Sequence, residues 1–457
     1  MISDFPAALQ PIIQTGYLEH EFQRGLTANL AFRQAADREV IPNGVGETVT
    51  RTRTGLLPKV TAPINVQGVS AQVATTVTTN PLLQTAAKLD DGLIPIIGAF
   101  EQYTLTLYEY GSTMDLNTRT SRVAIAPQFA LHAYQLGDQA ARSMDGLARD
   151  ALYGGYLGGN TFVRTASTTT AVPIDDVRGF LTGPLNGTMM PVSGTNPLAV
   201  TIGAGVYSII SVAVDPTNVS ATPGGMSGVL TLAAAVSAAD GAAGNPVISA
   251  VAPVIVRPNG RATAAALTAT DHFTMDALLD AVASLRNNNV PTIDGLYNVY
   301  LDASSHRQLF SDPNYRQLFQ GATNSNETFR SGMIEAPFLG TRFVPTTEAP
   351  SWPHPTTPGL RIHAPIVAGQ GALVEGTFEG MTNPDDGGTR SVDPEDMIID
   401  GVRMITRPPL DRFSQVIAQT WQWIGGYTTP TDTTTNSSII ASATNAALKR
   451  AAIIQHV

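Results

Sequence analysis

Residues 127–153 read PQFALHAYQLGDQAARSMDGLARDALY, and they carry the clearest structural signal of the chain. Its apolar residues recur at intervals of three or four positions, which places them on one stripe of an α-helix. The stripe consists of Phe129, Ala133, Leu136, Ala140, Met144, Leu147 and Ala151. Pro127 suits the first turn of such a helix, and Gly154-Gly155 is expected to end it. We therefore predict a rod of about 40 Å that buries Met144 and Leu147.

An arm is predicted on the N-terminal side of this rod, in residues 1–45. The apolar residues of positions 19–36 have mostly helical spacing, and the run Ile41-Pro42-Asn43-Gly44 is a stop signal. We therefore expect one helix over residues 19–36 within the arm.

Residues 46–110 have the pattern of an extended loop with two limbs. Positions 48–54 are rich in β-branched residues and positions 102–107 alternate between apolar and polar side chains, so each limb is predicted to be a strand. Between them, residues 60–87 contain no Asp, Glu, Lys or Arg. This segment is too polar for a core and too long for an ordinary connection. We expect the loop to lie on another molecule.

The charge of this loop supplies the candidate contact residues. From position 48 to position 87 the charged residues are Arg51, Arg53 and Lys59, so the loop carries +3 of the net −10 and the rest of the chain carries −13. Arg51 and Arg53 are two apart on the predicted strand and should project to one face. One interpretation is that each loop lies across the carboxylates of a neighbouring subunit. The other is that three solvated bases keep a polar hairpin soluble.

Residues 179–256 differ from the rest of the chain in composition, because Asp215 and Asp240 are their only charged residues. Strand-like runs alternate with turn signals such as Pro223-Gly224-Gly225 in this window. The runs are residues 198–202, 207–213, 228–232 and 253–257. We therefore predict a small all-β domain inserted at residues 179–262.

Helix and strand patterns alternate in the C-terminal half. Thr274 is a suitable N-cap for a helix over residues 274–286, and residues 303–310 favour a second helix. Strands are predicted at residues 297–301, 338–344, 397–405 and 413–424. After a linker rich in Thr and Ser, residues 445–454 are rich in Ala and are expected to form a short helix.

The composition excludes several classes of protein. An apolar content of 43% supports a sizeable core and excludes a wholly disordered chain. The lack of cysteine excludes disulfides, thiol catalysis and thiolate metal sites. A net charge of −10 argues against a general nucleic-acid coating protein. No apolar run reaches about 18 residues and no signal peptide is visible, so we expect no membrane span and synthesis in the cytoplasm.

No catalytic, cofactor or metal site is predicted. The sequence contains no HExxH and no Walker phosphate-binding loop. His354 and His363 lie close together in a Pro-rich stretch, but without a third ligand they are interpreted as solvated loop histidines. The acidic residues between positions 385 and 396 lack the spacing of an EF-hand. Trp421 and Trp423 alternate with a glutamine, which favours core or interface packing over a carbohydrate-binding platform.

The order of these parts, together with several local phrases, resembles a known family. Residues 110–155, from YGSTMDL through the predicted rod, are similar to one branch of the major capsid proteins of tailed bacteriophages, which have the Hong Kong 97 fold. Residues 274–310, with NNNVPTIDGLYNVYL, resemble the central helix, turn and buried strand of that branch. Residues 332–350, with GTRFVPTTEAP, resemble its strand-turn-strand segment. The resemblance covers most of residues 1–165 and 270–427 but not the predicted insertion.

The resemblance implies an α+β fold of the Hong Kong 97 type, with an arm, an extended loop, a spine helix, a peripheral domain and an axial domain. The expected parts are the arm at 1–45, the loop at 46–110, a peripheral domain at 111–178 with the spine helix at 127–153, the small all-β insertion at 179–262, an axial-type α/β domain at 263–385, return strands at 386–427 and a Thr/Ser-rich tail with a short helix at 428–457. We expect the insertion on the outer face of a shell, where it meets solvent.

The resemblance also implies a structural function, with no enzyme activity, cofactor or metal. Such a protein self-assembles as hexamers and pentamers into an icosahedral shell around packaged double-stranded DNA, without sequence-specific contacts. Its expected partners are its own copies, a portal protein at one vertex and separate scaffold and decoration proteins, and no membrane. Its expected location is the virion, after assembly in the host cytoplasm. Some relatives crosslink a loop lysine to a neighbour's asparagine; Lys59 lies in the loop, but no partner for it can be placed.

Three alternatives remain open on the sequence alone. A nanocompartment shell of the same fold would enclose enzymes instead of DNA. A phage tail or adhesion protein would explain the β-rich insertion but not the rod and the ordered phrases around it. An enzyme that uses an Asp/Glu pair, such as a glycosidase, needs no motif, and its mark would be a pocket with two carboxyl groups about 5–9 Å apart.

Overall fold

The described residues of the computed structural model form two compact units. Unit 1 comprises Met1–Thr50, Thr104–Ala151 and Leu373–Thr428, and unit 2 comprises Arg51–Tyr103, Leu152–Ala372 and Thr429–Val457. Within them, the structure describes residues 9–10, 17–26, 31–42, 46–54, 100–117, 125–185, 188–320, 339–378, 396–409, 415–432 and 445–457.

The predicted rod is helix α3 (Ile125–Tyr156), whose 32 residues make it about 48 Å long. The predicted end at Gly154-Gly155 is wrong, because both glycines lie inside the helix. A Cβ on Gly155 would lie 2.6 Å from the hydroxyl oxygen of Thr429, so this glycine leaves the space that the threonine occupies. Gly155 therefore allows close packing near the end of the helix, and a Cβ on Gly154 would meet no atom within 4 Å.

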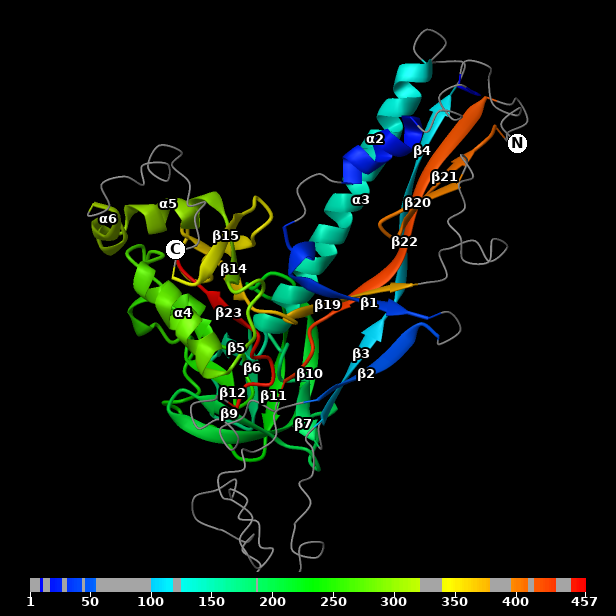
Figure 1. Ribbon diagram of the computed structural model, residues 1–457. Coiled ribbons are helices and arrows are strands. Elements are labelled where there is room, and N and C mark those ends of the chain that lie inside the picture. The colour runs from blue at the N-terminus through cyan, green and yellow to red at the C-terminus, as the bar shows by residue number, and fades with distance from the viewer. Residues whose placement is uncertain are drawn as a thin grey trace, which may run out of the picture. The chain divides into compact units, whose positions relative to one another are not determined.

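The sheet of unit 1 has the strand order β1-β19-β22-β21-β20, and β4 pairs with the other edge of β22 (Figure 1). The strands are β1 (Ala36–Ile41), β4 (Tyr108–Asn117), β19 (Leu373–Phe378), β20 (Asp396–Ile399), β21 (Val402–Arg407) and β22 (Val416–Thr428). β1 and β19 are parallel, and the other pairs are antiparallel. The single strand predicted at 397–405 is wrong, because Asp400 and Gly401 adopt φ angles of 51° and 80°. They form the two-residue turn of the β20–β21 hairpin.

Alternate residues of β22 point toward α3, which runs along β4 and β22, and form the core of unit 1 (Figure 1). Trp421 and Trp423 are 3% and 0% exposed, so of the predicted core or interface packing the structure shows core packing. The ring of Trp423 stacks on Tyr110 of β4, with the centroids 5.7 Å apart. On α3, Met144 is fully buried as predicted. Leu147 packs against the same core but is half-buried, so the prediction for this residue holds only in part.

Replacing Leu147 with Asp is expected to lower the free energy of unfolding by about 1–3 kcal/mol. The leucine side chain packs against the core, but its partial exposure lets a carboxylate keep part of its water. Leu131→Asp on the same helix is the control, because Leu131 is 50% exposed and its loss should change stability by less than about 0.5 kcal/mol. Chemical denaturation measures both, and equal losses would contradict this assignment of the buried face.

The arm contains a shorter helix than predicted. α2 spans Tyr17–Leu26, and Arg33–Ala35 is a 3₁₀ turn that leads into β1. The predicted continuation of the helix to residue 36 is wrong, because β1 pairs with β19 and tertiary pairing outweighs local helix propensity.

The predicted limbs of the loop are strands β2 (Thr48–Thr54) and β3 (Phe100–Thr106), which pair with each other. Residues 60–87 and Lys59 lie outside the described residues.

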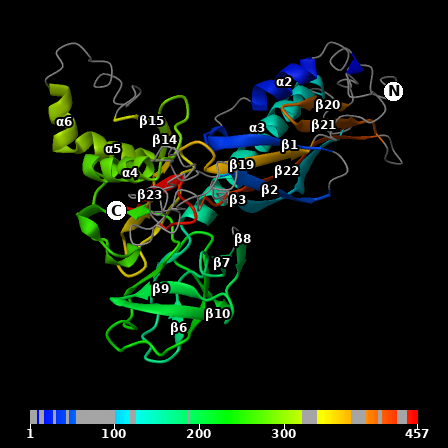
Figure 2. The same ribbon diagram turned by 60° about the horizontal axis from the view of Figure 1, so that its bottom comes forward.

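The predicted β-domain is a small barrel within unit 2 (Figure 2). Its strand order is β5-β12-β9-β10-β11-β6, and a bridge between Val163 and Ile174 joins the segments at the two ends of this order. The strands are β5 (Asn160–Phe162), β6 (Ala171–Ile174), β9 (Leu198–Ile202), β10 (Gly205–Val219), β11 (Met226–Leu232) and β12 (Pro246–Ser249). A hairpin of β7 (Thr182–Leu185) and β8 (Thr188–Pro191) is inserted after β6. The predicted start at residue 179 is therefore too late.

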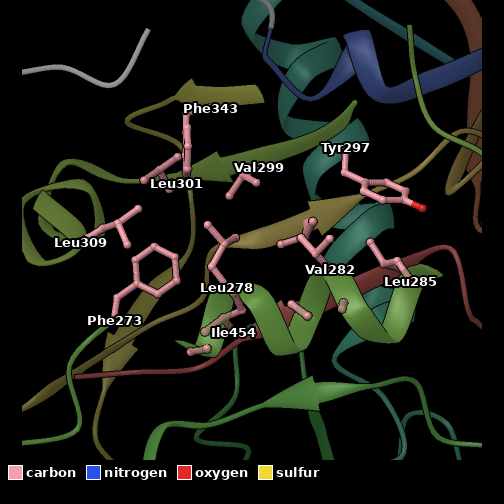
Figure 3. Close-up of a cluster of buried hydrophobic side chains, with 14 of the residues drawn as sticks. Phe273, Leu278, Val282, Leu285, Tyr297, Val299, Leu301, Leu309, Phe343 and Ile454 are labelled. Carbon is pink, nitrogen blue, oxygen red and sulfur yellow. The ribbon is translucent and has the colours of Figure 1, made fainter. Parts of the chain in front are cut away.

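The second sheet of unit 2 has the strand order β13-β23-β18-β14-β15. Its strands are β13 (Ile255–Val256), β14 (Tyr297–Leu301), β15 (Thr341–Pro345), β18 (Ile366–Ala368) and β23 (Ala451–Ile454). The chain also forms the 3₁₀ turns Pro258–Gly260 and Ala264–Ala266, the hairpin of β16 (Ser351–Pro353) and β17 (Arg361–His363), and helices α4 (Met275–Asn287), α5 (Ala303–Ser311) and α6 (Pro313–Gln320). Thr274 caps α4 as predicted. Leu278 and Val282 of α4 point toward Val299 of β14 in the buried cluster of Figure 3.

The short helix predicted at residues 445–454 is wrong. Residues 451–454 form β23, which is fully buried and pairs with β18 on one side and β13 on the other. A short apolar run is compatible with a buried strand as well as with a helix, and here pairing with β13 and β18 favours the strand.

The predicted axial domain also ends too late, because the chain from Leu373 belongs to unit 1. No helix in the described parts of the chain is long and apolar enough to cross a membrane.

Candidate assembly surfaces

Arg51 and Arg53 lie on β2 as predicted, and both side chains are half-buried. Arg53 is held inside unit 2, because its guanidinium donates to the carbonyl of Gly371 at 3.1 Å and lies 5.8 Å from the ring centroid of Tyr103. Burial and the nearby charge of Arg450 lower the pKa of Arg53. Arg53 therefore anchors the loop within its own chain. Arg51 is half-buried on the same strand, and its contact with a neighbouring subunit stays a prediction.

A polar face of the unit 1 sheet points away from α3, and we call it the outer face. It consists of Glu109, Gly111 and Thr113 of β4, Ala418, Thr420 and Gln422 of β22, and Ile405 and Arg407 of β21, which together with Trp421 line a shallow depression of about 350 Å³. The hydroxyl groups of Thr113 and Thr420 are hydrogen-bonded at 2.8 Å across its floor. Glu109 and Arg407 lie on the strands that flank β22, so the face carries both charges. Such a face suits contact with another polar protein surface.

A buried ion cluster fastens the arm within unit 1. The guanidinium of Arg33, 2% exposed, donates to both carboxylate oxygens of Glu375 at 2.7–3.1 Å and to Asp400 at 3.1 Å. Arg38 donates to the other oxygen of Asp400 at 2.8 Å, and the backbone N–H of Arg33 donates to Asp145 of α3 at 3.0 Å. Burial opposes the charge of Arg33, but the hydrogen bonds and attraction of Glu375 raise its pKa above the usual value. The cluster joins the arm, α3, β19 and the β20–β21 hairpin.

A pair of glycines brings the arm helix α2 against α3. A Cβ on Gly137 of α3 would lie 2.5 Å from the carbonyl oxygen of Phe22 and 3.2 Å from the Cα of Gly25. A Cβ on Gly25 would overlap the carbonyl oxygen of Tyr134. The two helices therefore meet backbone to backbone, which requires glycine at both positions.

The two histidines singled out in the sequence are not solvated, so that interpretation is wrong. His354 is 6% exposed, and its Nδ1 accepts a hydrogen bond from the backbone N–H of Thr357 at 3.0 Å. His363 Nδ1 lies 2.7 Å from a carboxylate oxygen of Asp302. Within the described residues, no group of three His, Asp or Glu side chains is placed to hold a metal ion. The acidic residues 385–395 lie outside this part of the chain.

A serine and a histidine that sequence reasoning missed are in contact in unit 2. Ser305 Oγ lies 2.7 Å from His456 Nε2, a distance typical of a nucleophile and its base. Both residues are 0% exposed, so no substrate reaches the hydroxyl in this structure. The pair is 151 positions apart in sequence and has no motif that would have identified it.

Comparison with known proteins finds no family model and no curated sequence that match the chain. Among solved structures, the chain is similar to the capsid of cyanophage P-SCSP1u, with 9% identity and a TM-score of 0.47 over 94% of this chain and 88% of that one. It is similar to the capsid of Ralstonia phage GP4, with 12% identity and a TM-score of 0.45 over the same shares. It is also similar to the capsid of cyanophage Pam1, with 10% identity and a TM-score of 0.44 over 91% of this chain and 86% of that one.

Proposed function

We propose that the chain is the major capsid protein of a tailed bacteriophage and that it self-assembles as hexamers and pentamers into an icosahedral shell. The order of its elements carries the proposal. The arm with α2 precedes the paired limbs β2 and β3, the long helix α3 follows, and β22 returns to the sheet beside α3 near the end of the sequence. This is the order that the resemblance in the sequence implies for the Hong Kong 97 fold.

The construction of unit 1 supports an assembling role. The ion cluster and the glycine contact fix the arm to a rigid body of α3 and its sheet. The outer face of the unit 1 sheet carries an acidic residue, Glu109, and a basic residue, Arg407, on either side of the polar residues of β22. Strand edges and polar faces of this kind gain contacts when copies of a chain associate.

The proposed shell encloses double-stranded DNA without sequence-specific contacts, and it has a portal protein at one vertex and separate scaffold and decoration proteins. A net charge of −10 suits a container that does not bind phosphate groups tightly. The proposed location is the virion, after assembly in the host cytoplasm, with no membrane partner. We place the β-barrel of unit 2 on the exterior of the shell. We assign the chain a structural role and no catalytic activity.

Sedimentation of the protein from expressing cells tests the self-assembly. We expect closed particles that sediment far ahead of single subunits, because the proposed contacts repeat around a closed lattice. A protein that sediments as single subunits under every condition, also with its scaffold protein present, would contradict the proposal. Enzymes instead of DNA inside particles from the native host would favour a nanocompartment.

Arg51→Glu is expected to leave the subunit folded but to reduce the yield of closed shells. An exposed ion pair contributes about 0–1 kcal/mol, so the effect depends on its repetition at every interface. Arg53 is left unchanged because it anchors the loop within the chain. Circular dichroism checks the fold, and negative-stain images count the shells. Thr50→Ser, on the same strand, is the neutral control; equal shell yields for the two variants would show that Arg51 does not contact a neighbour.

A further inference from the structure

Unit 2 buries a stack of aromatic rings contributed by Phe273, His456 and His363. The rings of Phe273 and His456 are 5.4 Å apart between centroids and 19° from parallel, and those of His456 and His363 are 5.4 Å apart and 16° from parallel. His456 and Phe273 are 0% exposed. His363 belongs to β17, and His456 follows β23, so the stack joins segments that are far apart in the sequence.

A chain of hydrogen bonds fixes the protonation of the central histidine. Asp302 caps the start of α5: its Oδ1 accepts from the backbone N–H of Ser305 at 3.1 Å and from the Ser305 hydroxyl. The single hydroxyl proton of Ser305 is used in that bond, so His456 Nε2–H must donate to Ser305 Oγ, 2.7 Å away. The Nδ1 atom of His456 is then unprotonated, and it is buried without a hydrogen-bond partner.

The backbone reinforces the contact between the two histidines. The N–H of His363 donates to the carbonyl of His456 at 2.8 Å, and the N–H of His456 donates back to His363 at 3.1 Å. β23 ends at Ile454, two residues before His456, and it lies between β13 and β18 in the sheet of unit 2. Loss of the contact between His456 and His363 would therefore weaken the attachment of β23, which is an interior strand of that sheet.

Of the groups around His456, Asp302 and the backbone oxygen of Val457 favour its protonation, whereas burial and the neighbouring histidines His363 and His272 oppose it. Asp302 faces His456 from α5 but is engaged by His363 Nδ1 at 2.7 Å. His272, on the segment before α4, is basic, and its Nδ1 lies 3.3 Å from the carbonyl of Val457. Arg257, on the segment after β13, donates to the neighbouring Gln455 at 2.8 Å. A proton on His456 would place a buried positive charge and an unpaired N–H donor among these basic groups.

We propose that His456 and His363 form an acid-sensitive latch, which holds the end of β23 against β17 and the start of α5 and opens when His456 is protonated. Burial first, and the charge of His363 next, lower the pKa of His456 to about 3, against about 6.5 in an unfolded chain. Below about pH 6.5 the unfolded chain therefore binds one proton more than the native protein. The stability that His456 contributes is lost progressively as the pH falls from about 6.5 toward about 3. The latch does not depend on the proposed function.

The test compares the full-length protein with His456→Gln, whose amide still donates to Ser305 but does not take up a proton. The unfolding equilibrium constants of both are measured by denaturant titration from pH 8 to pH 4. We expect the ratio of the wild-type constant to the variant constant to rise up to tenfold per pH unit below about 6.5. Parallel profiles would overturn the proposal. His20→Gln, whose side chain is 73% exposed on α2, is the control and should keep the wild-type profile.

A second measurement on the wild-type protein remains decisive if the variant does not fold. Histidine side chains labelled with ¹³C are followed by NMR over the same pH range. We expect one ring to stay neutral at pH 5, and the amides of His363 and His456 to exchange faster with solvent, relative to those of α3, as the latch opens. A spectrum in which every histidine titrates near pH 6.5 would overturn the latch, and so would exchange at the two amides that does not change with acid.

Discussion

Glu375→Gln is expected to lower the free energy of unfolding by about 3–5 kcal/mol. Glu375 is fully buried and holds the guanidinium of Arg33, which is 2% exposed, through bonds of 2.7–3.1 Å. The variant keeps the shape of the side chain but leaves a buried cation without its main counterion. Because the same arginine ties the arm to α3 and to the β20–β21 hairpin, the loss should loosen the arm first.

Two further variants separate the buried pair from its surroundings. Arg33→Met combined with Glu375→Leu removes both charges and should recover most of the stability, because well-packed apolar residues often replace a buried ion pair at little cost. Arg38→Gln removes a cation that is 48% exposed and should cost about 0–1 kcal/mol. Urea denaturation measures all three. A Glu375→Gln loss no larger than that of Arg38→Gln would show that the cluster does not hold the arm.

Gly137→Leu is expected to cost about 3 kcal/mol and to detach α2 from α3. A Cβ at this position would lie 2.5 Å from the carbonyl oxygen of Phe22, so the clash is with backbone and no side-chain rotation relieves it. Helix α2 must move away, which uncovers its buried residues Leu18, Phe22 and Leu26. Thermal denaturation and limited proteolysis within residues 17–26 report the change.

The matched control for this substitution is on the same helix. A Cβ on Gly146 of α3 would meet no atom within 4 Å, so Gly146→Ala should stabilise the helix by up to about 1 kcal/mol. A shared loss of stability in Gly137→Leu and Gly146→Ala would indicate a general sensitivity of α3 and not a close crossing of the two helices.

Sequence patterns predicted the helices and strands whose structure follows from local features, such as the spacing of apolar residues or a capping residue. The regular spacing from Phe129 to Met144 identified α3 because a two-turn repeat of apolar residues fits one buried helix face. Thr274 marked the start of α4, since its hydroxyl satisfies an N–H group of the first turn. The alternation around Trp421 and Trp423 favoured core or interface packing, and both rings lie in the core.

Other features depend on contacts between distant segments, and local patterns did not reveal them. Residues 451–454 form a strand because their backbone pairs with a neighbouring strand on each side, β13 and β18. This pairing outweighs the helix propensity of alanine. The partners of Arg33 are up to 367 positions away, so no spacing rule links them. The role of Gly137 in helix packing could not be predicted, because it depends on the close approach of Gly25 from a distant part of the sequence.

The strand position of two candidate contact residues was predicted, whereas their contact with a neighbouring subunit stays a prediction. The β-branched pattern placed Arg51 and Arg53 on a strand correctly. The surroundings of Arg53 were not predictable, because Gly371, whose carbonyl accepts its hydrogen bond, lies 318 positions away. The outer face of the unit 1 sheet was also missed, since it arises only when β4, β22 and β21 are side by side.

Electron cryomicroscopy of the particles formed by this chain would show whether the chain forms a capsid. The proposed function predicts closed icosahedral shells built from hexamers and pentamers, with α3 and the sheet of unit 1 repeated in every subunit and the β-barrel of residues 160–249 projecting outward. Open fibres, or a population of single subunits with no closed particles, would contradict the claim that this chain forms a capsid.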